Sequence, residues 1–154
     1  MDVVDAFERS MQKELDYKNE ARNILQFREF YKDRTEFYVP NAYKSISTGR
    51  VLVLEFIKGC KFTDVEQIKK WGLSPTQIAE TGMNIYLTQI FEFGYFHADP
   101  HPGNVLVRED GVICLIDFGM VGKMLRKDKY AFAGVFVAMA NHDPRQMAIQ
   151  MRNL

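Results

Sequence analysis

Three oxygen-bearing side chains in the sequence have the spacing needed to hold a metal ion beside a phosphate group. Asp99 and Asn104 lie five residues apart in one polar segment, and Asp117 follows after a turn flanked by two apolar runs. Mg²⁺ prefers oxygen ligands of this kind. If the apolar runs pair as a hairpin, Asn104 and Asp117 meet as metal ligands. Asp99 is then placed to accept or orient the proton of an attacking hydroxyl group.

The same residues belong to a longer pattern. Residues 97–104 read HADPHPGN, and residues 117–119 read DFG. Protein kinases pair an H-x-D-x-x-x-x-N loop with a D-F-G that comes one hairpin later. Either element alone is more typical of a turn, because Asp and Asn readily stabilise turns. Together, and in this order, they predict phosphoryl transfer from a nucleotide.

Two histidines, His97 and His101, flank Asp99 and would also suit a transition-metal site. No third His or Cys stands near them in the sequence, so this interpretation is disfavoured. We instead expect His97 to belong to the catalytic group and to anchor the loop by hydrogen bonding. His101 is expected to orient Asp99 or to contact a phosphate of the nucleotide.

An apolar run at residues 51–57, ahead of the loop, resembles the hinge segment that holds an adenine ring. Such a segment offers the Glu55 carbonyl and the Ile57 amide to the edge of the base. The alternative is an ordinary edge strand that ends at Gly59. The position of the run upstream of the catalytic loop favours nucleotide binding.

The amphipathic N-terminal region carries several carboxylates. Asp16 and Glu20 are four residues apart, so on a helix they share a face and repel each other unless a cation lies nearby. A solvated helix face is one interpretation. The other is that Glu20 pairs with a lysine that holds the nucleotide phosphates.

These residues depend on elements that the sequence pattern also predicts. Apolar spacing and capping residues indicate helices, β-branched and aromatic runs indicate strands, and Gly-containing segments indicate turns. The predicted helices cover residues 3–31 (one helix or two joined ones), 64–71 with Thr63 as cap, 75–93 with Ser74 as cap and Gly94 as stop, and two helices from Arg126, the second starting at Asp143-Pro144; the predicted strands cover 37–39, 43–47, 51–57, 105–107 and 112–116. The fold class is therefore α+β with a helical majority.

The composition of the chain restricts its function classes. Its 154 residues suit one domain, and 47% are hydrophobic. Twenty basic residues balance twenty acidic ones, which argues against nucleic acid as the main partner. Cys60 and Cys114 form no CxxC pair and are expected to be reduced packing residues. The longest apolar run, residues 130–140, is about half of the roughly 20 residues that a membrane span needs.

The motifs together resemble the UbiB/AarF family of atypical kinases. Residues 96–104 resemble its catalytic loop and residues 115–120 its metal-binding D-F-G. Glu14 and Asp16 look like its E-x-D motif, and residues 20–23 look like the E-A-x-N that follows.

The resemblance implies a protein-kinase-like fold that binds ATP and Mg²⁺. It also implies ATPase or small-molecule kinase activity, rather than protein kinase activity, and a role in ubiquinone or related isoprenoid-quinone synthesis at a membrane. By the same mapping, Glu20 is the partner of the phosphate-binding lysine. Glu14 and Asp16 face the family's K-x-G-Q extension.

Three family elements are absent from the sequence: the K-x-G-Q segment, the alanine-rich nucleotide loop and the V-A-x-K strand. We therefore expect the C-terminal part of a kinase-like domain, with the upstream N-lobe strands missing. The expected division is an αC-like helical region (1–36), a strand hairpin with the hinge (37–59) and a mainly helical C-lobe (60–154).

The expected partners are a nucleotide, an unknown small-molecule or lipid-like acceptor and the missing upstream lobe. A peripheral contact with a membrane is a further expectation. The chain is expected to be cytoplasmic, with peripheral attachment to a bacterial inner membrane or an organellar location as alternatives.

Two other functions remain open. Aminoglycoside and choline kinases share an H-x-D-x-H-x-x-N loop, but the glycine of D-F-G and the motifs around Glu14 and Glu20 favour the UbiB-type interpretation. A non-catalytic nucleotide-binding scaffold is the other alternative, because the phosphate-binding lysine and the nucleotide loop are absent.

Overall fold

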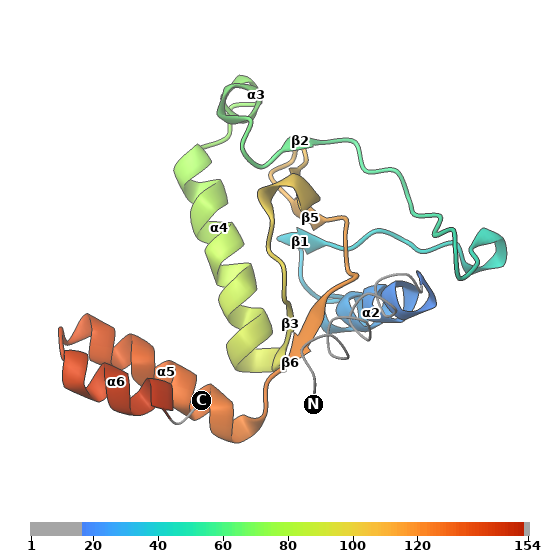
Figure 1. The fold of residues 1–154 in the computed structure, drawn as a ribbon. Coiled ribbons are helices and arrows are strands. Elements are labelled where there is room, and N and C mark those ends of the chain that lie inside the picture. The colour runs from blue at the N-terminus through green and yellow to red at the C-terminus, as the bar shows by residue number, and fades with distance from the viewer. Residues whose placement is uncertain (1–16, 153–154) are drawn as a thin grey trace.

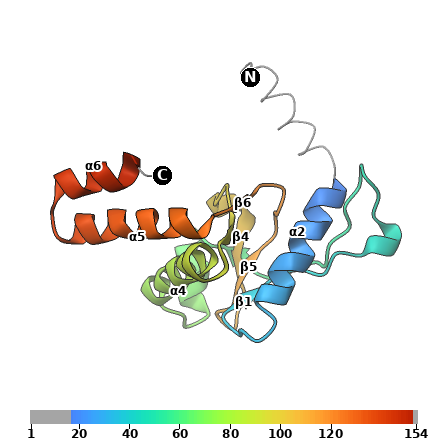
Figure 2. The same cartoon turned by 90° about the horizontal axis from the view of Figure 1, so that it is seen from below.

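The computed structural model describes residues 17–152, apart from the side chain of Lys127 (Figure 1). The predicted helix over residues 3–31 is observed from Tyr17 onward, and its earlier part lies outside the described residues. The chain folds as a small β-layer with helices on both sides, which confirms the predicted α+β class. Figure 2 shows α2 and α4 on opposite sides of β1, β4 and β5.

The helices begin and end largely at the residues that favour such boundaries. Asp143 accepts a hydrogen bond from the Gln146 amide at 3.0 Å at the start of the last helix, and Gly94 (φ 63°) ends the segment that follows α4. One predicted cap is wrong: Asp64, not Thr63, accepts the Gln67 amide at 3.0 Å. The helices are α2 (Tyr17–Phe30), α3 (Val65–Lys70), α4 (Pro75–Thr88), the π-helical η2 (Gln89–Phe93), α5 (Arg126–Ala140), α6 (Pro144–Arg152) and the short 3₁₀ turns η1 (Lys44–Ile46) and η3 (Pro102–Asn104).

The strands form two sheets in the described part of the chain. One is four-stranded in the order β1-β5-β4-β2, with β1 parallel to β5, and the other is the antiparallel pair β3-β6. The strands are β1 (Phe37–Tyr38), β2 (Cys60–Lys61), β3 (Tyr95–His97), β4 (Val105–Val107), β5 (Ile113–Leu115) and β6 (Val121–Lys123). The predicted hairpin of β4 and β5 is confirmed, and β3 and β6 were not predicted.

The predicted hairpin of residues 43–47 and 51–57 forms only in part: the Tyr43 amide donates to the Val53 carbonyl at 2.9 Å and the Glu55 amide to the Asn41 carbonyl at 2.8 Å, but the predicted strand over residues 43–47 is wrong. The paired part is an isolated antiparallel bridge between Ala42 and Leu54, and the 3₁₀ turn η1 follows where the strand was predicted. Two hydroxyl groups take over the backbone bonds of a ladder: Ser47 Oγ accepts the Val53 amide at 3.0 Å, and Thr48 Oγ1 accepts the Val51 amide at 3.1 Å. Ser and Thr side chains compete with strand pairing in this way, so the segment stays irregular.

The buried face of α2 holds the helix against the β3 strand and the D-F-G segment. Ile24 and Phe27 are fully buried, three residues apart on one face. The Phe27 ring lies 5.3 Å from that of Tyr95 and 5.0 Å from that of Phe118, measured between centroids. This aromatic cluster fixes the position of α2 relative to the predicted site.

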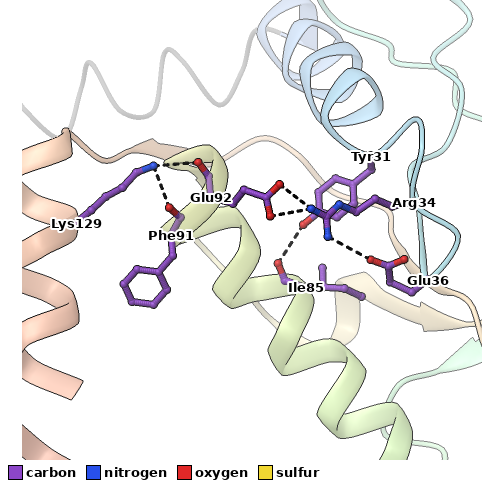
Figure 3. A network of polar contacts seen from close by, with 7 residues as sticks. All are labelled: Tyr31, Arg34, Glu36, Ile85, Phe91, Glu92 and Lys129. Atoms are coloured by element: carbon purple, nitrogen blue, oxygen red, sulfur yellow. Dashed lines mark hydrogen bonds and ion pairs between the residues drawn. The ribbon is translucent and has the colours of Figure 1, made fainter. Parts of the chain in front are cut away.

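A polar network at the other end of α2 joins three helical segments (Figure 3). The Tyr31 hydroxyl donates to the Ile85 carbonyl at 3.0 Å, and Arg34 contacts both carboxylate oxygens of Glu92 at 2.6 and 2.7 Å. Lys129 of α5 donates to the carbonyls of Phe91 and Glu92 at 3.2 and 3.1 Å. The network therefore ties the end of α2 to η2, and η2 to α5.

The last two helices, α5 and α6, lie side by side and extend away from α2 (Figures 1 and 2). Besides Lys129, two rings of α5, Phe132 and Phe136, contact the Phe91 ring of η2. None of the helices described is long and apolar enough to cross a bilayer. Both cysteines are free, and burial raises the pKa of Cys114 to about 11, in keeping with a packing role.

Candidate active site

Strand pairing places Asn104 next to Asp117. In the hairpin, Val105 pairs with Leu115, and the Ile116 amide donates to the Asn104 carbonyl at 3.0 Å. This register brings the two side chains to the same end of the hairpin. The Asn104 amide group (Nδ2) donates to Asp117 Oδ2 at 3.1 Å.

The Asp117 carboxylate is fixed on its other side as well. Oδ1 accepts the backbone amide of Gly119 at 2.8 Å. A Cβ atom added at Gly119 would lie 3.3 Å from this same oxygen, which is a tight contact. Glycine at this position therefore lets the backbone turn closely around the carboxylate.

His97 links the loop to the D-F-G segment through both ring nitrogens. It is 2% exposed; Nε2 donates to the Asp117 carbonyl at 2.9 Å, and Nδ1 accepts the Asp99 amide at 3.0 Å. This pattern needs a neutral imidazole with its proton on Nε2. Burial is the main cause that lowers the His97 pKa, and this favours the same neutral form. Because both nitrogens are occupied, His97 holds the loop and is not a metal ligand here.

His101 has a local role at the turn that precedes Asn104. Its Nδ1 accepts the Gly103 amide at 3.0 Å, which caps the 3₁₀ turn η3, and its side chain is exposed. The predicted contact of His101 with a phosphate or with Asp99 stays a prediction.

A polar pocket of about 300 Å³ brings together part of the predicted site, and Asn104 is not among the residues that line it. Three carboxylates, Glu20, Asp99 and Asp117, line it together with four other residues: Tyr17, His97, Gly119 and Met120. In the described part of the chain no Lys or Arg lines this pocket. A pocket with three carboxylates calls for a cation, either a metal ion or a basic side chain.

Glu20 enters this pocket from α2 and bonds to the D-F-G backbone. Its Oε1 accepts the Phe118 amide at 3.1 Å. Burial is the largest cause that raises the Glu20 pKa; the Phe118 hydrogen bond opposes it, and the charge of Asp117 adds to it. The lysine partner implied by the family resemblance is not present among residues 17–152 near this carboxylate.

The predicted hinge lies outside the pocket. The Glu55 carboxylate accepts hydrogen bonds from the Tyr38 hydroxyl at 2.8 Å and from the Asn41 amide at 3.0 Å. Within the described chain, no backbone hydrogen bond engages the Glu55 carbonyl or the Ile57 amide, the two groups predicted to meet adenine. Neither residue lines the 300 Å³ pocket. Glu14 and Asp16 lie outside the described residues.

The donor set fits magnesium. Asp117 offers a carboxylate and Asn104 an amide at hydrogen-bonding distance from it, and Mg²⁺ in nucleotide sites is held by one or two protein oxygens plus phosphates and waters. No group of three or more His, Cys, Asp or Glu residues suited to a metal ion occurs in the part of the chain that is described.

A second cavity, of about 410 Å³, lies between α4 and the β4–β5 hairpin. Its lining is largely apolar and includes Met83, Tyr86 and Leu115, with Pro100 and Pro102 of the catalytic loop at one side. His97 lines both this cavity and the polar pocket. The catalytic loop thus separates a polar space from an apolar one.

Two residues next to the site were not predicted to have a role. The Asn23 amide donates to the Phe118 carbonyl at 2.7 Å, and the Tyr95 hydroxyl donates to Asn23 Oδ1 at 2.8 Å. The sequence placed Asn23 only within a motif. Tyr95 carried no signal beyond its place two residues before His97.

Comparison with known sequences gives one consistent result. Residues 1–151 match the family model described as the ABC1 atypical kinase-like domain. The chain is 40% identical over 146 residues to the protein ACTIVITY OF BC1 COMPLEX KINASE 1, chloroplastic, of Arabidopsis thaliana, which covers 95% of this chain and 21% of that protein. It is 36% identical over 152 residues to the probable protein kinase UbiB of Histophilus somni, covering 96% of this chain and 28% of that protein.

A solved structure agrees with the sequence matches. The structure of the Rv3197–erythromycin complex from Mycobacterium tuberculosis superposes with a TM-score of 0.71 and 26% identity, over 97% of this chain and 37% of that one. The chain thus spans between about a fifth and two fifths of the length of these relatives.

Proposed function

Because the chain belongs to the family of ABC1 atypical kinase-like domains, which includes proteins named UbiB, we propose that it handles ATP and Mg²⁺ in phosphoryl transfer. The membership confirms the resemblance found in the motifs and the predicted kinase-like fold. The observation that carries the proposal is the Asn104–Asp117 contact of 3.1 Å, because Asp117 also lines a pocket together with Asp99.

Each residue has a distinct task in this proposal. Asp117 and Asn104 would hold the magnesium ion, which when bound neutralises charge on the phosphate oxygens. Asp99 orients the acceptor hydroxyl and takes its proton. His97 keeps Asp99 and Asp117 in one arrangement, because its ring joins the backbones of both residues. The hinge groups of Glu55 and Ile57 would bind the adenine edge.

The acceptor is proposed to have an apolar part. The apolar cavity behind the catalytic loop supports this class, since it lies beside Pro100 and Pro102. An acceptor with an apolar part is in keeping with what the family resemblance implies: a lipid-like acceptor, a peripheral membrane contact and a place in isoprenoid-quinone synthesis.

The first experiment tests metal-dependent nucleotide binding in the natural polypeptide that carries this chain. We expect Asp117→Asn to weaken binding of MgATP in calorimetry by at least about tenfold and to abolish hydrolysis, because the metal loses a charged ligand. The matched control is Asp33→Asn, the same change at an exposed aspartate after α2. Unchanged nucleotide affinity and hydrolysis in Asp117→Asn would reject the proposal.

Assays of the unaltered protein with MgATP, alone and with an aminoglycoside or choline, separate the alternatives. MgATP binding without turnover in the unaltered protein would favour the scaffold. Phosphate transfer to an aminoglycoside or to choline would favour that group of kinases, against which the family match over residues 1–151 argues.

A further inference from the structure

Helix α2 holds both backbone polar groups of Phe118. Glu20 Oε1 accepts the Phe118 amide at 3.1 Å, and the Asn23 amide donates to the Phe118 carbonyl at 2.7 Å. Glu20 and Asn23 are three residues apart and therefore share one face of the helix. Two side chains of one helical turn thus fix the middle residue of the D-F-G segment.

The hydroxyl of Tyr95 sets the orientation of the Asn23 amide. The Phe118 carbonyl can only accept a hydrogen bond, so the Asn23 NH₂ group must face it. The Asn23 oxygen then faces the Tyr95 hydroxyl, which donates to it at 2.8 Å. Tyr95 is buried on β3, two residues before His97, so this bond connects α2 to the strand that carries the catalytic loop.

These contacts restrict the direction of Asp117. Its carbonyl is held by His97 at 2.9 Å, and the next residue is held by α2. The Phe118 ring is fully buried against Phe27, so the segment cannot rotate about that side chain without opening the core. Among residues 17–152, the Phe118 carbonyl is bonded by Asn23 alone, so loss of this bond would leave the carbonyl unheld.

We propose that Asn23 and Tyr95 are positioning residues for the metal site: they hold the Phe118 carbonyl so that the Asp117 carboxylate stays directed into the polar pocket. This inference rests on the proposed function, since it assumes that Asp117 binds the metal. It assigns a role to two side chains that do not line the polar pocket. Outer residues of this kind typically change metal affinity by about 10–100-fold when altered.

The test uses Tyr95→Phe and Asn23→Leu in the natural polypeptide, with Mn²⁺ as the metal probe in the presence of saturating ADP. We expect each variant to weaken Mn²⁺ binding, measured by electron paramagnetic resonance, by about tenfold. Binding of ADP without metal is expected to stay unchanged. Amide hydrogen exchange at Phe118 and Gly119 is expected to become faster.

The matched control is Tyr31→Phe. Tyr31 and Tyr95 are similarly buried, at 4% and 8% exposed. The Tyr31 hydroxyl donates to the Ile85 carbonyl of α4, and the Tyr95 hydroxyl donates to Asn23 of α2. Of these two hydroxyl groups, only that of Tyr95 bonds to Asn23, which in turn donates to the Phe118 carbonyl. The double variant Asn23→Leu/Tyr95→Phe should bind Mn²⁺ no more weakly than Asn23→Leu, because Tyr95 acts through Asn23.

Each outcome has a distinct meaning. If Asp117→Asn abolishes Mn²⁺ binding while Tyr95→Phe and Asn23→Leu retain it, the positioning role is overturned and the proposed function stands. An equal loss in Tyr31→Phe would also overturn the role, because it would reflect general loosening. If Asp117→Asn retains Mn²⁺ binding, both proposals fail.

Discussion

Glu55 fixes a segment of backbone that has almost no regular strand pairing. Its carboxylate accepts the Tyr38 hydroxyl, and it also accepts the backbone amide and the side-chain amide of Asn41 at 3.0 and 3.1 Å. The Asn41 backbone hydrogen bond is the largest cause that lowers the Glu55 pKa. One side chain therefore stabilises the segment that is proposed to meet adenine.

The lowered pKa gives the folding stability a defined pH dependence. A carboxylate whose folded pKa lies below its ordinary value of 4.5 contributes stability that is present above that pH and is lost as the pH falls through the folded value. We expect Glu55→Gln to lower the free energy of unfolding by about 1 kcal/mol at pH 7 and to flatten the acid decline. Urea unfolding between about pH 3.5 and 7 measures both effects.

The control for this change is Glu109→Gln, at an exposed glutamate in the β4–β5 turn. It should leave the stability at pH 7 and the acid decline as they are in the unaltered protein. An acid decline in Glu55→Gln as steep as that of the unaltered protein would contradict the role assigned to Glu55.

Individual contacts of the site differ in how far the sequence could predict them. Asn104 and Asp117 were predicted to meet, because one short hairpin with a glycine at its turn joins them; Gly111 has a φ of 83°. The contact between Glu20 and the Phe118 amide spans 98 residues and depends on how α2 packs. The bonds of Asn23 have the same origin, so no local pattern could reveal them.

The junction of η2 with α5 is held by a lysine. The π-helical η2 ends at Gly94, whose positive φ of 63° suits glycine. Lys129 donates to the carbonyls of Phe91 and Glu92 (Figure 3). A Cβ atom at Gly94 would lie 2.5 Å from Lys129 Cε. The small residue therefore gives the lysine access to the end of the helix, where a cation is favourable.

Replacing this lysine should loosen the last two helices. We expect Lys129→Met to lower the free energy of unfolding by about 1 kcal/mol, since two carbonyls lose a charged donor. Faster amide exchange is expected in α5 and α6. Chemical denaturation and hydrogen exchange measure these effects, with Lys70→Met in the last turn of α3 as control. Equal effects of the two substitutions would show that the Lys129 contacts add nothing specific.

The helices were predicted better than the strands, for a physical reason. Ser74-Pro75 and Asp143-Pro144 combine a capping side chain with a proline in the first turn, and such signals are local. Strands β3 and β6 have three residues each and no clear alternation, so only their tertiary pairing defines them. The hairpin at 43–57 is paired only near Ala42 and Leu54, because Ser47 and Thr48 replace further ladder bonds by side-chain bonds.

The fold brings the site together from distant parts of the sequence. Glu20 comes from α2, whereas Asp99 and Asp117 come from the loop and the hairpin, and all three line one pocket. A metal–nucleotide complex bound there would join these parts. The predicted division at residues 36 and 59 stays a prediction.

Binding should therefore stabilise the folded protein against heat. At an MgADP concentration of about 100 times its dissociation constant, the free energy of unfolding should rise by about 2.7 kcal/mol. Differential scanning calorimetry should show a higher Tm, and chelation of the metal with EDTA should remove most of the shift. A Tm shift that persists in full with EDTA would contradict binding through the magnesium site.

The pairing of β3 with β6 has a consequence for everything that lies between them. His97 pairs with Val121, so the two ends of the segment that contains Asp99, Asn104 and Asp117 lie next to each other in the β3–β6 pair. These three side chains depend on the same strand pair, so we expect them to become ordered or disordered together. A side chain introduced at Gly122 would collide with the Phe96 ring and disturb the β3–β6 pairing. We therefore expect such a substitution to impair all three site residues together.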